Sequence, residues 1–263
     1  MSRRILRAAS AVASLSVTAA CAAPSRGAHP PTTLATGGST LTQAQALQLS
    51  SVLYRNFQAG GAVVKVEVAY TAGTTVDMVG QIDFRHHEGH LSVTTVTAGT
   101  GTSVEDVDYT STEVYEKGGP VVAQELAAHG HPGQTWVARA PDPTHRPIDK
   151  VIQILVALAS PTRNNPLLVQ ESDARYLGMA TRDGVATAVY RYNTAITYEV
   201  GVGDGILRRF TASVQGFSGP VTVDVTAPGV QALPPPPADR VLIVSRSTSP
   251  STLTNPPPSG GAP

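Results

Sequence analysis

The chain has 263 residues, enough to bury one hydrophobic core, and its single cysteine excludes disulfide bonds within the chain. Basic and acidic side chains number 19 each, so the basic excess typical of nucleic-acid-binding proteins is missing. Glycine (24 residues) and proline (21 residues) require many turns and unstructured segments, which argues against a helix bundle.

The first residues have the order of a secretory signal. Three arginines precede a short apolar run, Ala8 to Ala20, and Cys21 follows directly. The run is about 13 residues long, well short of the roughly 20 that a membrane-spanning helix needs. Small residues before a cysteine resemble a bacterial lipobox, although Thr18 stands where an aliphatic residue is usual. Residues 1–21 are therefore expected to be a lipoprotein signal whose Cys21 is diacylglycerylated, with ordinary secretion as the alternative.

Two segments have the composition of unstructured chain. Residues 22–40 are rich in Pro, Gly, Ser and Thr and are expected to form a flexible linker. Residues 228–263 contain the run Pro234 to Pro237 and are expected to be largely disordered. Within this tail, Asp239 to Val244 is apolar enough for one short edge strand. The folded domain is therefore expected over residues 41–227.

A helix and then a meander of strands open the domain. Thr42 and Gln45 have the spacing of a capping box that starts a helix, and the pair Gly60-Gly61 ends it. After this helix, apolar residues recur at every second position, which is typical of half-buried strands. The segments with this alternation are 64–70, 76–84 and 90–96.

The second half of the domain contains a second helix and a final set of hairpins. Pro147 and Asp149 suit the first turn of a helix whose apolar residues, Ile148 to Leu158, share one broad face. Before this helix, residues 107–138 break into short strands and loops. After it, turns near Asp183, Asn193 and Asp204 separate the remaining strands. These strands are expected at 176–181, 185–192, 196–202, 206–214 and 221–225.

Consecutive strands joined by short turns predict an antiparallel sheet, and about two helices can cover only one of its faces. The expected fold class is therefore α+β, with a curved antiparallel β-sheet, or half-barrel, wrapped around or covered by about two helices.

Turn and packing motifs in a fixed order resemble the actinobacterial lipoproteins of the LppX/LprAFG type, whose fold is similar to the LolA half-barrel. The resemblance extends over the folded part of the chain, and none of its motifs is a catalytic signature. The motifs are Cys21, the strand Gly80 to Phe84, the helix Ile148 to Leu158, the hairpin Asp183-Gly184-Val185, the segment Asp204 to Arg209 and the ending Val223 to Pro228.

The resemblance implies a non-enzymatic lipoprotein on the outer face of the cytoplasmic membrane that carries a lipid or lipoglycan between the concave sheet and its helices. An incompletely covered concave face would leave an apolar cavity for acyl chains. The residues expected to line it are Val64, Val66, Val68, Met78, Ile82, Phe84, Leu91 and Val93 on strands, facing Val151, Ile152 and Leu155 on the second helix.

The same apolar residues at the same spacing also make an ordinary solid core. With a filled core, the protein would be a structural or signalling surface lipoprotein that acts through an envelope protein partner. A secreted hydrolase is the third alternative, and no motif supports it. The chain has no Gly-x-Ser-x-Gly elbow, and its lone cysteine is assigned to the lipid anchor.

The remaining motifs have a structural and a functional interpretation each. His86, His87 and His90 surround Glu88, but the spacing is that of a hairpin turn, so a solvated turn is favoured over a zinc or copper site. The glycine-rich segment Gly201 to Gly205 joins two strands instead of opening a helix, which argues against phosphate binding.

Three arginines and the single tryptophan have no assigned role in the sequence. Arg182, Arg208 and Arg209 either meet anionic head groups near the cavity mouth or are solvated surface residues. Trp136 is expected to be a buried or rim aromatic in a strand. No metal and no cofactor is expected.

Overall fold

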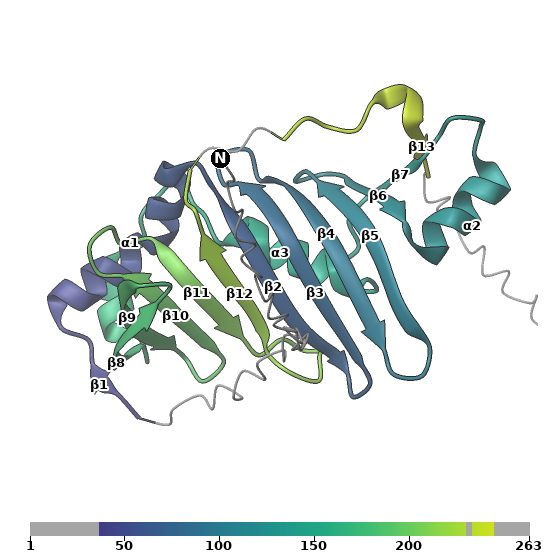
Figure 1. The fold of residues 1–263 in the computed structure, drawn as a ribbon. Helices are drawn as coiled ribbons and strands as arrows, with labels where there is room; N and C mark the ends of the chain where they lie inside the picture. The colour runs from purple at the N-terminus through teal and green to yellow at the C-terminus, as the bar shows by residue number, and fades with distance from the viewer. Residues whose placement is uncertain (1–36, 230–232, 245–263) are drawn as a thin grey trace, which may run out of the picture. The chain divides into compact units, whose positions relative to one another are not determined.

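The computed structural model describes residues 37–229 and 233–244, which form an open, curved sheet with helices on its concave side (Figure 1). The sheet has 13 strands in the order β1-β8-β9-β10-β11-β12-β2-β3-β4-β5-β6-β7-β13. Every neighbouring pair is antiparallel except β13 with β7. The expected α+β half-barrel is thus observed, with more strands and helices than expected.

The elements have the following bounds. The helices are α1 Gln43–Ala59, α2 Gly119–His129, α3 Pro147–Ala157 and α4 Pro166–Glu171, with a 3-10 turn at Ala238–Arg240. The strands of the first half are β1 Ser39–Thr40, β2 Gly61–Thr71, β3 Thr74–Asp83, β4 Glu88–Thr97, β5 Gly101–Tyr109, β6 Val114–Gly118 and β7 Trp136–Arg139. Those of the second half are β8 Arg175–Arg182, β9 Val185–Tyr192, β10 Ile196–Gly201, β11 Leu207–Ala212, β12 Val221–Thr226 and β13 Val241–Ile243.

The helix α1 starts and ends as its sequence predicts. The Thr42 hydroxyl accepts a hydrogen bond from the Gln45 N–H, and the Gln45 side chain accepts one from the Thr42 N–H, so the capping box is complete. Gly60 adopts a left-handed φ of 89° at the other end, a conformation that favours glycine. Its N–H donates to the Asn56 and Phe57 carbonyls, which ends the helix before β2.

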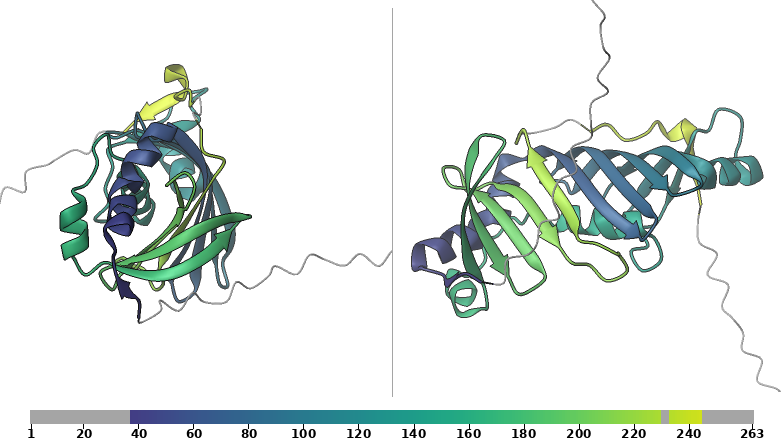
Figure 2. Two further views of the ribbon diagram at one scale, coloured as in Figure 1. Left: turned by 90° about the vertical axis from the view of Figure 1, so that its left-hand side faces the viewer. Right: turned by 60° about the horizontal axis from the view of Figure 1, so that its bottom comes forward.

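Among the described strands, the topology sends the chain across the sheet three times: from β1 to β2 through α1, from β7 to β8, and from β12 to β13. From β2 the strands build outward to β7, and the next strand in sequence, β8, lies in the other half beyond β12. The connection between β7 and β8 therefore has to cross one face of the sheet, and it contains α3 and α4. End-on, the sheet curves around the helices of this inner face (Figure 2).

Two strands approach unusually closely at Gly80. The register pairs Gly80 of β3 with Leu91 of β4, and a Cβ added at Gly80 would lie 1.9 Å from the His90 carbonyl oxygen. A larger residue would therefore push β3 and β4 apart at the centre of the first half of the sheet.

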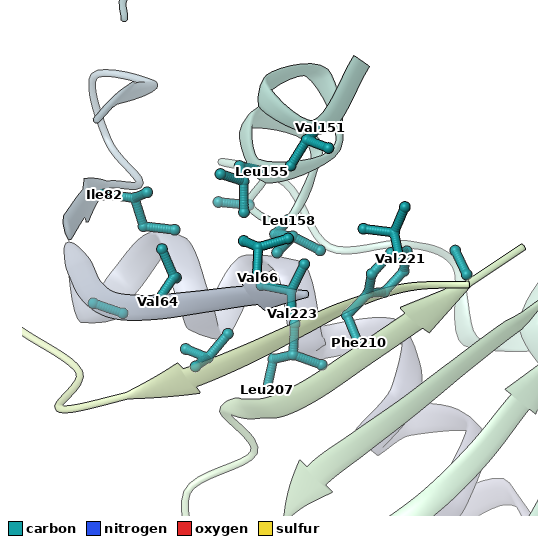
Figure 3. Packing of buried hydrophobic residues seen from close by; sticks show 14 of the residues in the cluster. Val64, Val66, Ile82, Val151, Leu155, Leu158, Leu207, Phe210, Val221 and Val223 are labelled. Carbon is teal, nitrogen blue, oxygen red and sulfur yellow. The ribbon is translucent and has the colours of Figure 1, made fainter. Parts of the chain in front are cut away.

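The helix α3 packs its apolar side onto the concave face. Figure 3 shows Val151 and Leu155 on the side of α3 that faces the strands, with Leu158 directly after the helix, opposite Val66 and Ile82. All five side chains are buried and belong to one continuous core cluster. The apolar stripe recognised in the sequence is thus the stripe that covers the sheet.

Several expectations need correction or fall outside the described residues. Two helices, α2 and α4, were not expected, because both are short and lie between glycines or prolines that suggested loops. The edge strand expected in the tail is confirmed as β13, and its pairing with β7 is parallel. Cys21, the signal and most of the linker lie outside the described residues.

No helix among the described residues is long and apolar enough to cross a membrane.

The packing of α3 predicts which leucines matter for stability. Leu155 is buried against the sheet, whereas Leu167 on α4 is 60% exposed. Replacing Leu155→Ala should lower the free energy of unfolding by about 2–5 kcal/mol through lost burial and a residual cavity. The matched change Leu167→Ala should cost less than about 0.5 kcal/mol. Urea unfolding of both variants measures the difference, and equal losses would contradict the packing described.

Candidate functional site

The residues expected to line a lipid cavity are all part of the packed core. Each is at most 4% exposed, and they come from β2, β3, β4 and α3, except Phe84, which follows β3 directly. They are Val64, Val66, Val68, Met78, Ile82, Phe84, Leu91, Val93, Val151, Ile152 and Leu155.

A pocket that borders the eleven expected lining residues is too small for an acyl chain. It lies beside Val68, Met78 and Val151 and has a volume of about 10 Å³, whereas ligand pockets usually measure about 300–1,000 Å³. In this structure α3 fills the space in which the sequence predicted a cavity. That these residues contact a lipid stays a prediction.

A groove of about 360 Å³ with both apolar and polar lining lies instead at the end of the sheet that carries β8 to β10, between α1 and α4. The helix α1 supplies one wall, α4 and the loop before it the second, and tyrosines of β9 and β10 the floor. Its lining residues are Leu49, Val52, Leu53, Asn164, Asn165, Leu168, Val169, Tyr192 and Tyr198. The lining contains no charged side chain, and two asparagines supply its amide groups.

Backbone hydrogen bonds fix the second wall to α1. The Ser160 N–H donates to the Leu53 carbonyl and the Asn164 N–H to the Ser50 carbonyl, both at 3.1 Å. Asn165 caps α4, its side-chain oxygen accepting from the Leu167 N–H at 3.0 Å. The groove is therefore held open by main-chain contacts rather than by the apolar side chains that line it.

One buried and one half-buried amide hold α1 against the rest of the domain. The Asn56 side chain is 0% exposed, donates to the Leu158 carbonyl at 2.7 Å and accepts from the Leu207 N–H at 3.1 Å. It thereby joins α1, the end of α3 and β11. The Gln48 amide accepts from the Tyr190 hydroxyl at 2.7 Å and donates to the Gly201 carbonyl. Both amides set the position of the groove wall on α1.

A buried cluster of charges fixes the other end of α3. The Arg139 guanidinium contacts both oxygens of Asp149, at 2.5 and 2.7 Å, and also hydrogen-bonds Glu116. The Arg146 guanidinium bonds both oxygens of Glu116, at 3.1 and 3.2 Å. From the sequence, the negative charge of Asp149 was expected to stabilise the positive N-terminal end of the helix. In the structure its carboxylate forms a bidentate pair with Arg139. The cluster connects α3 to β6 and β7.

Glu105 adds a third carboxylate to this cluster. Burial is the main cause that raises its pKa, and repulsion from Glu116 raises it further, while Arg139 and Arg146 oppose the shift. The arrangement is structural, since a pocket of only about 30 Å³ adjoins it.

The motifs singled out in the sequence are accounted for by local structure. His86 and His87 lie in the β3–β4 turn, where the His86 ring pairs with the Asp83 carboxylate at 2.8 Å. Within residues 37–229 and 233–244, no three His, Cys, Asp or Glu side chains gather closely enough to hold a metal ion.

The three arginines considered as head-group ligands are paired within the fold. Arg182 binds Glu199 at 2.8 Å, Arg209 binds Asp224 at 2.5 Å and Arg208 contacts Asp204. The Asp204 side chain also accepts from the Ile206 N–H, so the glycine-rich segment forms the β10–β11 turn, as its position between strands indicated. These arginines therefore stabilise the sheet.

The groove between α1 and α4 was missed in the sequence because α4 was missed. Asn165 followed by Pro166 is an N-cap with proline in the first turn, and the apolar Leu167, Leu168 and Val169 follow. This signal is present but short, and only the packing of α4 on α1 turns it into a groove wall.

Comparisons with known proteins leave the chain without an assigned family. No family model and no curated protein matches it. Among solved structures, MucB is similar, with 13% identity and a TM-score of 0.32 over 72% of this chain. The MucA/MucB complex of Pseudomonas aeruginosa gives 12% identity and a TM-score of 0.30 over 69% of this chain. The matched part spans 59% and 55% of those chains, and at these TM-scores the likeness decides neither fold nor function.

The position of Glu105 predicts a pH-dependent stability. Because its folded pKa is raised above the unfolded value, the ionised form opposes folding, and this cost appears as the pH rises through the folded pKa. Glu105→Gln should therefore be more stable than the parent near pH 7, by a few tenths to about 1 kcal/mol, and the gain should vanish near pH 4. Urea unfolding at both pH values tests this, with Glu171→Gln on exposed α4 as control. A gain that persists at low pH would show that the charge of Glu105 is not its cause.

Proposed function

We propose that this protein is a non-enzymatic, membrane-tethered extracytoplasmic protein that binds an acyl chain of a lipid or lipoglycan in the groove between α1 and α4. The observation that carries the proposal is the groove itself, a space of about 360 Å³ lined by leucine, valine and tyrosine side chains together with two asparagine amides. Its volume falls in the usual range of ligand pockets. Each methylene that leaves water on binding contributes about 0.8 kcal/mol.

Exposed apolar side chains beside the groove support a membrane-derived ligand. Leu168 is 65% and Leu167 is 60% exposed, and both are on the six-residue α4. Exposed apolar groups that adjoin a groove mark sites of contact with apolar partners. The Asn164 and Asn165 amides in the groove lining can hydrogen-bond the ester or hydroxyl groups that follow an acyl chain.

The start of the described chain supports a tether at the same end. The edge strand β1 pairs with β8, so the chain enters the fold beside β8, the edge of the half that contains the groove (Figure 1). With Cys21 as a lipid anchor, roughly 16 residues would separate the bilayer from this end, a maximal span of about 55 Å. A tether of this length would keep the groove within reach of the bilayer.

The filled core is also compatible with the alternative function, in which the protein binds no lipid and acts only through a protein partner. The two functions differ in whether the purified protein retains an acylated lipid. Native mass spectrometry of residues 22–263, before and after incubation with phosphatidylglycerol and phosphatidylinositol, makes this distinction. A stoichiometric extra mass that organic solvent releases as acylated lipid is expected. A clean apo mass after both incubations would contradict lipid binding and favour the partner.

Substitutions within the groove test where the lipid binds. Leu53→Glu and Leu168→Glu replace an apolar contact of the groove lining by a carboxylate and should reduce lipid occupancy at least about tenfold, because a bound acyl chain would remove water from the charge without compensating it. The matched control is Leu47→Glu, also on α1 and 53% exposed but outside the groove lining. Occupancy is measured by native mass spectrometry, and thermal unfolding verifies the fold. Equal occupancy in all three variants would place the lipid elsewhere.

A further inference from the structure

A second groove, of about 670 Å³, lies outside the apolar core. Its floor is a row of side chains that runs across four strands: Gln81 of β3, His90 of β4, Asp108 of β5 and Tyr115 of β6 are paired in register. These four alternate with buried residues such as Leu91 and Val107, so they point away from α3. Glu88, Thr110 and Trp136 complete the floor and walls.

A proline-rich segment, Leu233 to Pro237, forms the roof of this groove (Figure 1). It is anchored on both sides: the Gly229 N–H donates to the Gly61 carbonyl at 2.8 Å, and the Thr135 N–H donates to the Arg240 carbonyl at 2.9 Å. The strand β13 then pairs with β7. Because the four prolines have no N–H, the roof donates no backbone hydrogen bond from them to the floor. It covers the space without filling it.

The charges that line the groove are acidic. Glu88 and Asp108 are carboxylates, His90 is the single imidazole, and no lysine or arginine is among the lining residues. The His90 ring hydrogen-bonds the Asp108 carboxylate. The Glu88 carboxylate and the Gln81 amide make no hydrogen bond or salt bridge with any other described residue, although Glu88 acts on nearby His86 through space. One carboxylate of the groove therefore lacks a direct partner.

These charges decide between classes of ligand. An anion would meet two carboxylates, and the neighbouring Lys117, which lies over Trp136, already pairs with Asp106, so the groove disfavours an anion. A neutral ligand, such as a sugar, can donate hydroxyl hydrogen bonds to the carboxylates but leaves their negative charge uncompensated. A cation neutralises them, and the aromatic rings of Tyr115 and Trp136 add attraction at their faces. A cation–π contact of this kind is present within the protein, because the Lys117 ammonium lies over the Trp136 ring, 5.5 Å from its centroid.

We propose that the groove formed by Glu88, Asp108, Tyr115 and Trp136 under the proline-rich roof is a binding site for a cationic amine. The ammonium group contacts the Glu88 carboxylate, and the apolar part of the ligand lies between the aromatic side chains and the proline rings. The ammonium can belong to a small polyamine or to a lysine side chain of a protein, and the experiment separates these sources.

The single tryptophan gives this site its own probe. Trp136 is the one tryptophan of the chain, so a change in tryptophan emission reports on this groove. Residues 22–263 are titrated with spermidine, with an acetylated Gly-Lys-Gly peptide, with neutral maltose and with citrate at low salt. A saturable change with spermidine or with the peptide, and none with maltose or citrate, is expected. Binding of the peptide alone would identify a protein as the source, and binding of spermidine a free amine.

A variant without the Glu88 carboxylate tests the proposal most directly. Glu88→Gln keeps the shape of the side chain and removes its charge, so amine affinity should fall at least about fivefold. The matched control is Asp77→Asn, on the same face of β3 as Gln81 but outside the groove lining, which should stay within about twofold. Thermal unfolding verifies that both variants are folded.

Three results would overturn the proposal: no saturable change with either amine, equal affinity of parent and Glu88→Gln, or binding of maltose. The site shares no residue with the groove between α1 and α4. Failure of amine binding would therefore leave lipid binding untouched, and failure of lipid binding would leave this proposal standing.

Discussion

The connection between β7 and β8 has to cross the sheet from one half to the other, and the rest of the structure depends on that crossing. A segment that crosses the concave face must bury one side against apolar strands and still satisfy its polar groups. The helix α3 meets both demands. Its apolar side joins the core cluster, while its ends are held by polar contacts, Asp149 to Arg139 at one end and the Leu158 carbonyl to Asn56 at the other. The curved sheet is therefore built around a helix and is not an empty shell.

This filled core explains where binding space remains. With α3 in place, the central concave face is packed to near zero exposure, and the larger grooves lie where α3 does not reach. One is between α1 and α4, lined by apolar side chains. The other is on the opposite face, where the proline-rich roof covers a row of polar side chains. The two grooves differ in chemistry because the two faces of a strand differ: alternate residues face the core and the solvent. The domain thus carries two grooves with different side-chain linings at separate places.

The sequence predicted those features that depend on local patterns. The capping box at Thr42, the Asp183-Gly184 hairpin and the apolar stripe of α3 follow from spacing alone, and the structure confirms them. The curved antiparallel sheet also follows, since short turns join most of its strands. The grooves do not follow, because they depend on contacts between segments far apart in sequence. Asn165 with Pro166 signals a helix start but not its packing on α1, and nothing local places Pro234 beside Trp136. The eleven residues chosen as a lipid lining were correctly assigned to the buried face, but periodicity cannot distinguish a cavity from a filled core.

The central claim is that α3 fills the half-barrel and leaves acyl-chain binding to the groove between α1 and α4. The most direct measurement is a crystal structure with a fatty acid brominated near its methyl end, because anomalous scattering from bromine locates the chain. The account predicts a bromine peak beside Leu53 and Leu168, with α3 unmoved against Val66. A peak between α3 and the sheet, next to Val66 and Met78, would show that the core opens to admit lipid and would contradict the account.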